Sequence, residues 1–212
     1  TILLTSIPRD SYVTLHSFGA KDKLTHSGIY GVEETVDTVE DWLDYDMNYY
    51  IKANFSMLVD IVDAIDGVDV YSDFEFKSSV ADFYYNEGEN HLSGMAALYF
   101  ARERKAFEDE DIERGRNQQK VLKAMINKTT QSKVILTKYT QLLDAVEDEM
   151  QTNMSEKDIS SLVKMQINDM GKWTINTISI TGTDAYAPTY SMGSQELAVV
   201  IPDETSVEAA KQ

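Results

Sequence analysis

Alternating signals for strand, helix and strand constrain the fold of this chain more than any other feature of its sequence. Residues 48–55 alternate and are rich in aromatic side chains, which is typical of a strand. A helical segment follows, with Ser56 as its expected N-cap and Gly67 as its C-terminal stop. Residues 68–72 form the next expected strand. This alternation predicts an α/β domain with three layers, in which helices cover both faces of a central mixed sheet.

The other expected elements extend the same pattern along the chain. Strands are expected at 1–8, 173–182 and 196–202, and a turn-rich loop at 183–195. Helices are expected at 31–45, 94–104, 112–128, 133–150 and 155–170, with Ser93, Asp111 and Ser155 as N-caps of the second, third and fifth. We find no linker or repeat, and 212 residues with 42% hydrophobic content are enough for one core. The sequence therefore predicts a single domain over residues 1–212.

The composition excludes several classes of function. A formal net charge of −17 argues against general binding of nucleic acid, which depends on many Lys and Arg contacts. Cysteine is absent, which excludes disulfides, thiolate metal sites and cysteine nucleophiles. No apolar run approaches the roughly 20 residues of a membrane span. Because the strand-like run at residue 1 has no preceding cap or turn, we expect that the chain starts inside a domain and that a segment is missing upstream.

Four of the five arginines fall within residues 101–120: Arg102, Arg104, Arg114 and Arg116. A guanidinium is a planar fork of donors that matches phosphate oxygens two at a time. The fifth, Arg9, follows Pro8 at the end of the first expected strand, where ligands often bind. This pattern predicts a site for an anion with several oxygens, such as a pyrophosphate. The alternative is a set of surface salt bridges to the abundant carboxylates.

Helical geometry ranks these candidate ligands. Residues two apart on a helix do not share a face, so Arg102 and Arg104 can meet one ligand only if their helix ends near them. Arg114 and Gln118 lie one turn apart on the next helix and share a face near its N-terminus, where free N–H groups favour an anion. Arg116 points elsewhere and is expected to be the weaker ligand.

Three further features have two interpretations each. Asp10 either forms a neutralising pair with Arg9, or positions and deprotonates an acceptor hydroxyl. The acidic run at 107–113 is either a divalent-metal loop or, as we favour, a solvated loop that helps to cap the next helix. His26 is either structural or, because its loop also holds Lys23, part of the site.

Several ordered motifs together resemble the LytR-CpsA-Psr family: LTSIPRD, DKLTHSGIYG, YYIKANF, VDAIDGVDV, ENHLSGMAALYFARER and RGRNQQKVLKA. They cover roughly residues 1–130, and the C-terminal part resembles streptococcal CpsA-type members. The resemblance implies a membrane-anchored, extracytoplasmic enzyme of a Gram-positive bacterium. Such enzymes transfer capsular polysaccharide, wall teichoic acid or a similar glycopolymer from a polyprenyl-pyrophosphate carrier to peptidoglycan, with Mg²⁺ (or Mn²⁺).

The resemblance also implies roles for individual residues. The pyrophosphate-binding positions of the family match Arg9, Arg102, Arg104, Arg114 and Gln118, whereas Arg116 has no counterpart in many members. With Asp10, the first three are the expected catalytic residues. They would spread the charge that develops as a muramic-acid hydroxyl attacks the sugar-linked phosphorus. Apolar side chains of 55–65 and 83–100 are the expected walls around the polyprenyl tail.

Two other function classes use the same residues. A lipid-pyrophosphate pyrophosphatase would replace the sugar hydroxyl with water, and a non-catalytic protein would bind polyprenyl phosphates in a regulatory role. The family's metal-binding aspartates and its membrane anchor are expected upstream of residue 1, so the resemblance assigns no metal ligand in this chain.

A first prediction concerns magnesium. Because the expected aspartate ligands lie upstream of residue 1, the 212-residue chain should bind Mg²⁺ poorly when it is titrated by calorimetry. Tight, stoichiometric binding would show that the ligands lie within this sequence.

Overall fold

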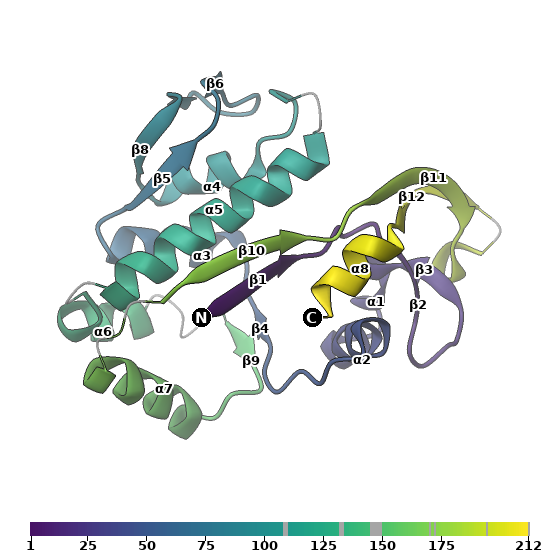
Figure 1. Ribbon diagram of the computed structural model, residues 1–212, viewed down its shortest axis with the longest axis horizontal. Helices are drawn as coiled ribbons and strands as arrows, with labels where there is room; N and C mark the ends of the chain where they lie inside the picture. Colours follow the sequence, from purple (N-terminus) through teal and green to yellow (C-terminus); the bar gives the residue numbers. More distant parts are fainter. Residues whose placement is uncertain are drawn as a thin grey trace. The chain divides into compact units, whose positions relative to one another are not determined.

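The computed structural model describes residues 1–107, 110–131, 134–144, 150–169, 171, 173–193 and 195–211, and it confirms the α/β class (Figure 1). The chain divides into two compact units, each built from two stretches. Unit 1 contains Thr1–Leu4 and Tyr49–Asn176, and unit 2 contains Thr5–Asn48 and Thr177–Gln212. Strand β1 (Ile2–Ser6) pairs with β10 (Ile175–Ser179), and both strands have residues in each unit. The two units are described separately below.

Unit 1 is built around the helices α4 and α5. Helix α4 packs against α3 and α5, and α5 also packs against strand β5. The antiparallel pair β5–β8 and the short hairpin β6–β7 complete the core. The elements are β4 (Ile51–Lys52), α3 (Phe55–Ala64), β5 (Val68–Ser72), β6 (Phe76–Lys77), β7 (Tyr84–Tyr85), β8 (Gly88–Leu92), α4 (Gly94–Arg102), α5 (Glu110–Gln131), α6 (Val134–Asp144), β9 (Gln151–Thr152) and α7 (Glu156–Asp169).

Unit 2 combines two antiparallel strand pairs with three helices. A parallel bridge between Ser11 and Val200 connects the β2 segment to β12, so the strands of this unit form a small mixed arrangement. Its hydrophobic core includes Val13, Val39, Leu43 and Ile180. The elements are β2 (Tyr12–Thr14), β3 (Lys21–Lys23), α1 (Leu24–Ser27), α2 (Val32–Leu43), β11 (Gly182–Pro188), the 3₁₀ turn η1 (Tyr190–Met192), β12 (Glu196–Pro202) and α8 (Glu204–Ala210).

The strands differ from the sequence-based expectation in three respects. In the described residues, the strands form two-stranded sheets and not one continuous central sheet. The expected strand at 48–55 is reduced to Ile51–Lys52, because α3 already begins at Phe55. The expected loop at 183–195 contains most of β11, which pairs with β12 along its whole length. Cross-strand pairing therefore outweighs the turn-rich composition of this segment.

Most of the other differences from the sequence-based expectation concern where a helix begins and which residue caps it. Asn54, and not Ser56, caps α3 by accepting the N–H of Met57 at 2.8 Å. The Ser93 side chain makes no cap bond, and the N–H of Gly94 donates instead to Asp63 Oδ1 of α3 at 2.7 Å. Asp111 lies inside the first turn, because α5 begins at Glu110. Ser155 caps α7 as expected, accepting the N–H of Asp158.

The last two expected helices are both present in the described residues. Helix α6 covers Val134–Asp144, and the expected continuation at 145–149 lies outside the described residues. Helix α7 starts at Glu156 and ends at Asp169. Among the helices that the structure describes, none combines the length and the apolar character needed to cross a bilayer.

A second prediction tests the close contact between α3 and α4. A Cβ on Gly94 would lie 2.8 Å from both Asp63 Oδ2 and Val59 Cγ1, and closer still to the carbonyl oxygen of Val59. Gly94→Ala should therefore lower the free energy of unfolding by about 1–3 kcal/mol. Urea denaturation measures this loss, with Gly171→Ala as the control because, among the described residues, no atom outside its chain neighbours lies within 4 Å of its Cβ position. Equal stability of both variants would contradict the described packing.

Candidate functional site

The first part of the candidate site is the turn that ends α4. The helix stops at Arg102, and Glu103 adopts an extended conformation (φ −63°, ψ 137°), so Arg104 lies beyond the helix. Because the helix ends between the two arginines, both guanidiniums can contact one ligand, as the sequence requires. Both arginine side chains are exposed.

Glu103 holds this turn, and sequence reasoning missed it. Its residue surface is only 1% exposed, and its two carboxylate oxygens accept three backbone N–H groups. Oε2 accepts from Ser79 at 2.6 Å, and Oε1 accepts from Arg104 at 3.0 Å and from Ala106 at 3.2 Å. The sequence feature that could have indicated its role is the position of an acidic residue between two arginines at a helix end. The buried carboxylate thus fixes the backbone that carries Arg102 and Arg104.

The hydrogen bonds also keep Glu103 ionised. Burial opposes the charged form, but the N–H donors of Ser79, Arg104 and Ala106 outweigh it and lower the pKa of this carboxyl below its usual value. Backbone donors thus stabilise the negative charge of this carboxylate. Two of these donors belong to the turn itself, and the third, the N–H of Ser79, comes from a segment 24 residues earlier.

Arg102 makes a second contact that the sequence did not predict. Its Cζ atom lies 4.5 Å from the centroid of the Phe55 ring, a distance typical of a cation–π interaction. Phe55 is the first residue of α3 and is 59% exposed. Because Asn54 caps α3 at this point, the ring sits at a defined position. It therefore orients the guanidinium at the surface of unit 1.

Helix α5 carries the remaining unit 1 candidates. Arg114 is half-buried in the second turn of the helix, and Gln118 follows one turn later with an exposed side chain. Arg116 donates to the buried carboxylate of Glu113 at 3.0 Å, and Lys120 lies 3.5 Å from the same group. The guanidinium of Arg116 is thus engaged within its own helix. Because α4 packs on α5, the two arginine-bearing elements are neighbours.

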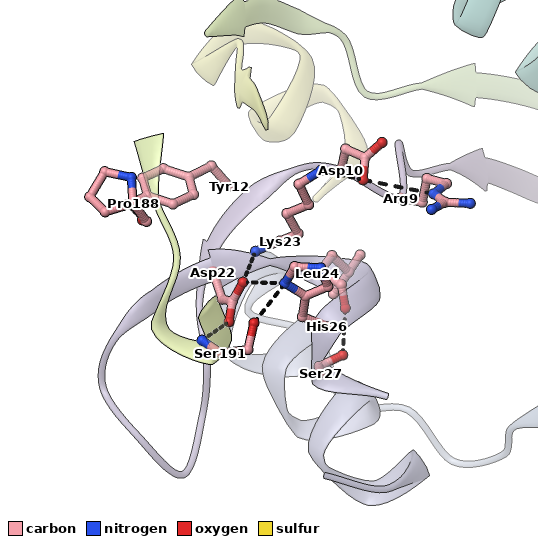
Figure 2. Close-up of polar contacts among 10 residues, drawn as sticks. All are labelled: Arg9, Asp10, Tyr12, Asp22, Lys23, Leu24, His26, Ser27, Pro188 and Ser191. Carbon is pink, nitrogen blue, oxygen red and sulfur yellow. Dashed lines mark hydrogen bonds and ion pairs between the residues drawn. The ribbon is translucent and has the colours of Figure 1, made fainter. Parts of the chain in front are cut away.

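Unit 2 contains Arg9 and Asp10. Asp10 Oδ1 lies 3.7 Å from Arg9 Nε and 3.3 Å from Lys23 Nζ (Figure 2). Lys23 is the more buried cation, with 14% of its side chain exposed against 66% for Arg9. Sequence reasoning gave Asp10 only Arg9 as a partner. Of the two cations, the nearer is instead Lys23, the last residue of β3.

His26 belongs to a partly buried polar network and does not form a catalytic triad. Asp22 Oδ1 lies 2.6 Å from His26 Nδ1, and Ser191 Oγ lies 2.8 Å from the same nitrogen (Figure 2). In a Ser-His-Asp relay, the carboxylate and the hydroxyl contact opposite ring nitrogens. Asp22 Oδ2 also accepts the N–H of Ser191 at 2.8 Å. The network therefore ties the Ser191 turn to α1.

No metal centre is evident among the residues that the structure describes, since they contain no group of three His, Asp or Glu side chains placed to hold an ion. The acidic run at 107–113 lies partly outside the described residues, so its two interpretations stay open. The described donors do not by themselves fit a Mg²⁺ site.

Comparison with known proteins gives consistent matches. The profile of the LytR_cpsA_psr family matches residues 1–207, which include parts of both units. The Bacillus licheniformis polyisoprenyl-teichoic acid–peptidoglycan teichoic acid transferase TagU is 36% identical over 160 residues, or 75% of this chain and 51% of its own length. The chain thus spans about half the length of the curated relatives it matches.

Solved structures match over almost the whole chain. The crystal structure of B. subtilis TagV is 30% identical, with a TM-score of 0.76 over 98% of this chain and 79% of TagV. A structure of TagT bound to LI-WTA is 27% identical, with a TM-score of 0.75 over 99% of this chain and 76% of TagT. These similarities confirm the expected fold.

A third prediction concerns Glu103. Glu103→Gln replaces one accepting oxygen with an amide that cannot accept an N–H, so the free energy of unfolding should fall by about 1–3 kcal/mol at pH 7. Because the folded pKa is lowered, the ionised carboxylate stabilises the fold above its unfolded pKa of about 4.3 and loses this effect as pH falls through the folded value.

The difference between Glu103→Gln and the unaltered chain should therefore narrow in acid, which denaturation at several pH values measures. Glu89→Gln, on an exposed side chain of β8, is the matched control. A difference that is constant with pH would contradict this role of the ionised carboxylate.

Proposed function

This chain belongs to the LytR_cpsA_psr family, and we propose that it transfers a glycopolymer from a polyprenyl-pyrophosphate carrier to peptidoglycan. The name of its TagU relative supports the substrate classes, because that enzyme is a polyisoprenyl-teichoic acid–peptidoglycan teichoic acid transferase. Capsular polysaccharide and wall teichoic acid are both candidates for the polymer. The proposal includes a membrane-anchored enzyme on the extracytoplasmic face of the cell.

The observation that carries this proposal is the turn fixed by Glu103. It presents two guanidinium-bearing residues, Arg102 and Arg104, at a helix end whose backbone is held by three hydrogen bonds. Preorganised cations of this kind stabilise charge that develops in a transition state without rearranging during the reaction. Arg114 and Gln118 on the adjoining helix extend the set of donors.

The proposed reaction is a phosphoryl transfer. A hydroxyl oxygen of the acceptor forms a bond to the sugar-linked phosphorus, and the bond from that phosphorus to the bridging pyrophosphate oxygen breaks. Polyprenyl phosphate leaves with the electron pair, and the hydroxyl proton passes to a base, for which Asp10 is the proposed candidate. Arg102 and Arg104 would bind the phosphate oxygens as their charge redistributes. Within unit 2, Arg9 retains its proposed phosphate-binding role.

The polyprenyl tail requires an apolar environment. The segments 55–65 and 83–100, which we expected to line it, supply Val62, Ile65 and Phe100 to the buried core of unit 1. Phe55 and Met95 from the same segments are exposed. These exposed side chains are the better candidates for contact with lipid, because the buried ones already pack against each other.

We also propose that the reaction uses Mg²⁺ or Mn²⁺. Such an ion would neutralise phosphate charge when bound. Since the described residues do not form a suitable group of ligands, we assign none of them to the ion and derive no step through it.

A fourth prediction tests the two arginines. Arg102→Ala and Arg104→Ala should each lower the transfer rate at least about a hundredfold, because each removes a preorganised charge from the phosphate oxygens. Chromatography of glycopolymer attached to a peptidoglycan acceptor measures this rate. Thermal denaturation should show little change, since both side chains are exposed.

Lys105→Ala is the matched control, because it removes a neighbouring exposed positive charge that has no proposed contact with phosphate. Unchanged transfer in both arginine variants would defeat the site assignment.

A further inference from the structure

Three aromatic rings form an exposed cluster on unit 2, here called the aromatic platform: Phe18, Tyr30 and Tyr190. The ring centroid of Phe18 lies 4.5 Å from that of Tyr30 and 4.8 Å from that of Tyr190. The three residues are 38%, 40% and 48% exposed, so each packs against its neighbours while part of its surface faces solvent. The three residues come from three separate segments of unit 2. A single exposed aromatic side chain is common on protein surfaces, but three such rings in contact form an apolar patch that indicates a binding site.

Buried carboxylates hold two of these loops in place. Asp22 is fully buried and accepts the N–H of Ser191, the residue after Tyr190. Glu34 is 5% exposed, and its carboxylate accepts the N–H of Ser17, the residue before Phe18, at 3.2 Å. Two loops of the platform are therefore braced by backbone hydrogen bonds from within the unit.

The third loop is fixed in a similar way. The N–H of Tyr30 donates to the carbonyl of Ser27 at 3.0 Å. Ser27 is buried, and its hydroxyl donates to the carbonyl of Leu24 and contacts Thr35 Oγ1 at 2.8 Å. The rings are thus preorganised, which reduces the entropy that a ligand loses on binding.

The charges around the platform restrict what it binds. Helix α2 begins directly after Gly31 and carries Glu33, Glu34 and Asp37 in its first two turns. The carboxylate of Glu33 is exposed and lies close to Gly31, next to Tyr30. The exposed carboxylate of Glu33 repels anionic lipid headgroups and polyphosphates. It favours a neutral ligand whose hydroxyl groups donate to carboxylates and to tyrosine oxygens.

A pyranose ring has this combination of properties. One face presents C–H groups that pack on an aromatic ring, and its edges carry hydroxyl groups for polar contacts. The glycan strand of peptidoglycan consists of such rings, whereas a teichoic acid is a chain of negatively charged phosphodiesters. The exposed carboxylate of Glu33 beside the platform therefore favours the acceptor glycan over the transferred polymer.

Hydrogen bonds and an ion pair link the platform to the candidate site of unit 2. Asp22, which anchors the Tyr190 loop, accepts the N–H of Lys23 at 2.7 Å (Figure 2). Lys23 in turn pairs with Asp10, beside Arg9. The adjacent residues Asp22 and Lys23 thus link the platform, through their side chains, to the residues proposed to bind phosphate and to accept the hydroxyl proton.

We propose that Phe18, Tyr30 and Tyr190 form a stacking site for the glycan strand of the peptidoglycan acceptor. This inference rests on the proposed transferase function for the identity of the glycan. The platform holds N-acetylhexosamine rings of the acceptor and so positions its hydroxyl near Asp10.

The fifth prediction measures glycan binding without any donor substrate. Tyr190→Ala should weaken the binding of chitotetraose, a neutral oligomer of N-acetylglucosamine, by about tenfold in a ligand-observed NMR titration. Tyr190→Phe, which keeps the ring, should stay within about twofold of the unaltered chain. Tyr186→Ala is the matched control, because Tyr186 is a 75% exposed tyrosine of the same unit outside the platform. Equal affinity for Tyr190→Ala and Tyr186→Ala, or no binding to the unaltered chain, would overturn the proposal.

Two further probes test the identity of the occupant. A glycerol-phosphate oligomer and phosphatidylglycerol vesicles should show no binding that depends on Tyr190. If Tyr190→Ala abolishes binding of either probe and leaves chitotetraose unaffected, the platform serves the donor polymer or the membrane, and the acceptor assignment is wrong.

The same titration separates this proposal from the proposed function. Arg102→Ala should leave chitotetraose binding unchanged while it abolishes transfer. Tyr190-dependent binding in a chain that transfers no polymer would support the platform and reject the transferase function. Transfer without Tyr190-dependent binding would reject the platform alone.

Discussion

The hydrogen bonds that converge on the buried carboxylate of Glu103 determine where α4 ends and where its arginines lie. The helix is held at two other points: Asp63 accepts the first N–H, and the Tyr85 hydroxyl donates to the carbonyl of Ala96 at 2.8 Å. Its buried face of alanines and Phe100 packs in the core of unit 1. With its first turn held by two contacts and its end fixed by Glu103, the helix has little freedom to rotate or to extend. The exposed guanidinium of Arg102 is thus placed by buried contacts, and Phe55 limits its remaining motion.

Unit 2 also contains buried carboxylates that accept backbone N–H groups. Asp22 and Glu34 are buried carboxylates whose pKa values burial tends to raise, yet hydrogen bonds from Ser191 and Ser17 lower them overall. This use of acidic residues suits a chain with 36 acidic and 19 basic residues, where few cations are available as buried partners. Backbone N–H groups neutralise part of the buried charge instead. Arg9 and Arg102 remain at the surface, where an anion would meet them.

Local signals in the sequence predicted the elements whose structure depends on local contacts. The end of α4 near Arg102, the strands at 68–72 and 196–202, and the cap at Ser155 all follow from periodicity and nearby residues. Features that depend on distant partners were missed. Glu103 accepts an N–H from a residue 24 positions earlier, and Asp22 accepts one from a residue 169 positions later. No local pattern encodes such contacts, so the positioning residues of both units emerged only from the structure, while the arginines themselves were evident from their clustering.

The central claim is that this chain moves a phosphate-linked glycopolymer to a sugar hydroxyl. Mass spectrometry of the products tests it most directly, with a lipid-pyrophosphate oligosaccharide as donor, in the presence and absence of a peptidoglycan acceptor. The account predicts polyprenyl phosphate together with an acceptor that has gained the oligosaccharide phosphate, and little cleavage without acceptor. Release of free oligosaccharide phosphate at the same rate with or without acceptor would show a pyrophosphatase, and an intact donor under both conditions would show a protein that only binds it. Either result would contradict the account.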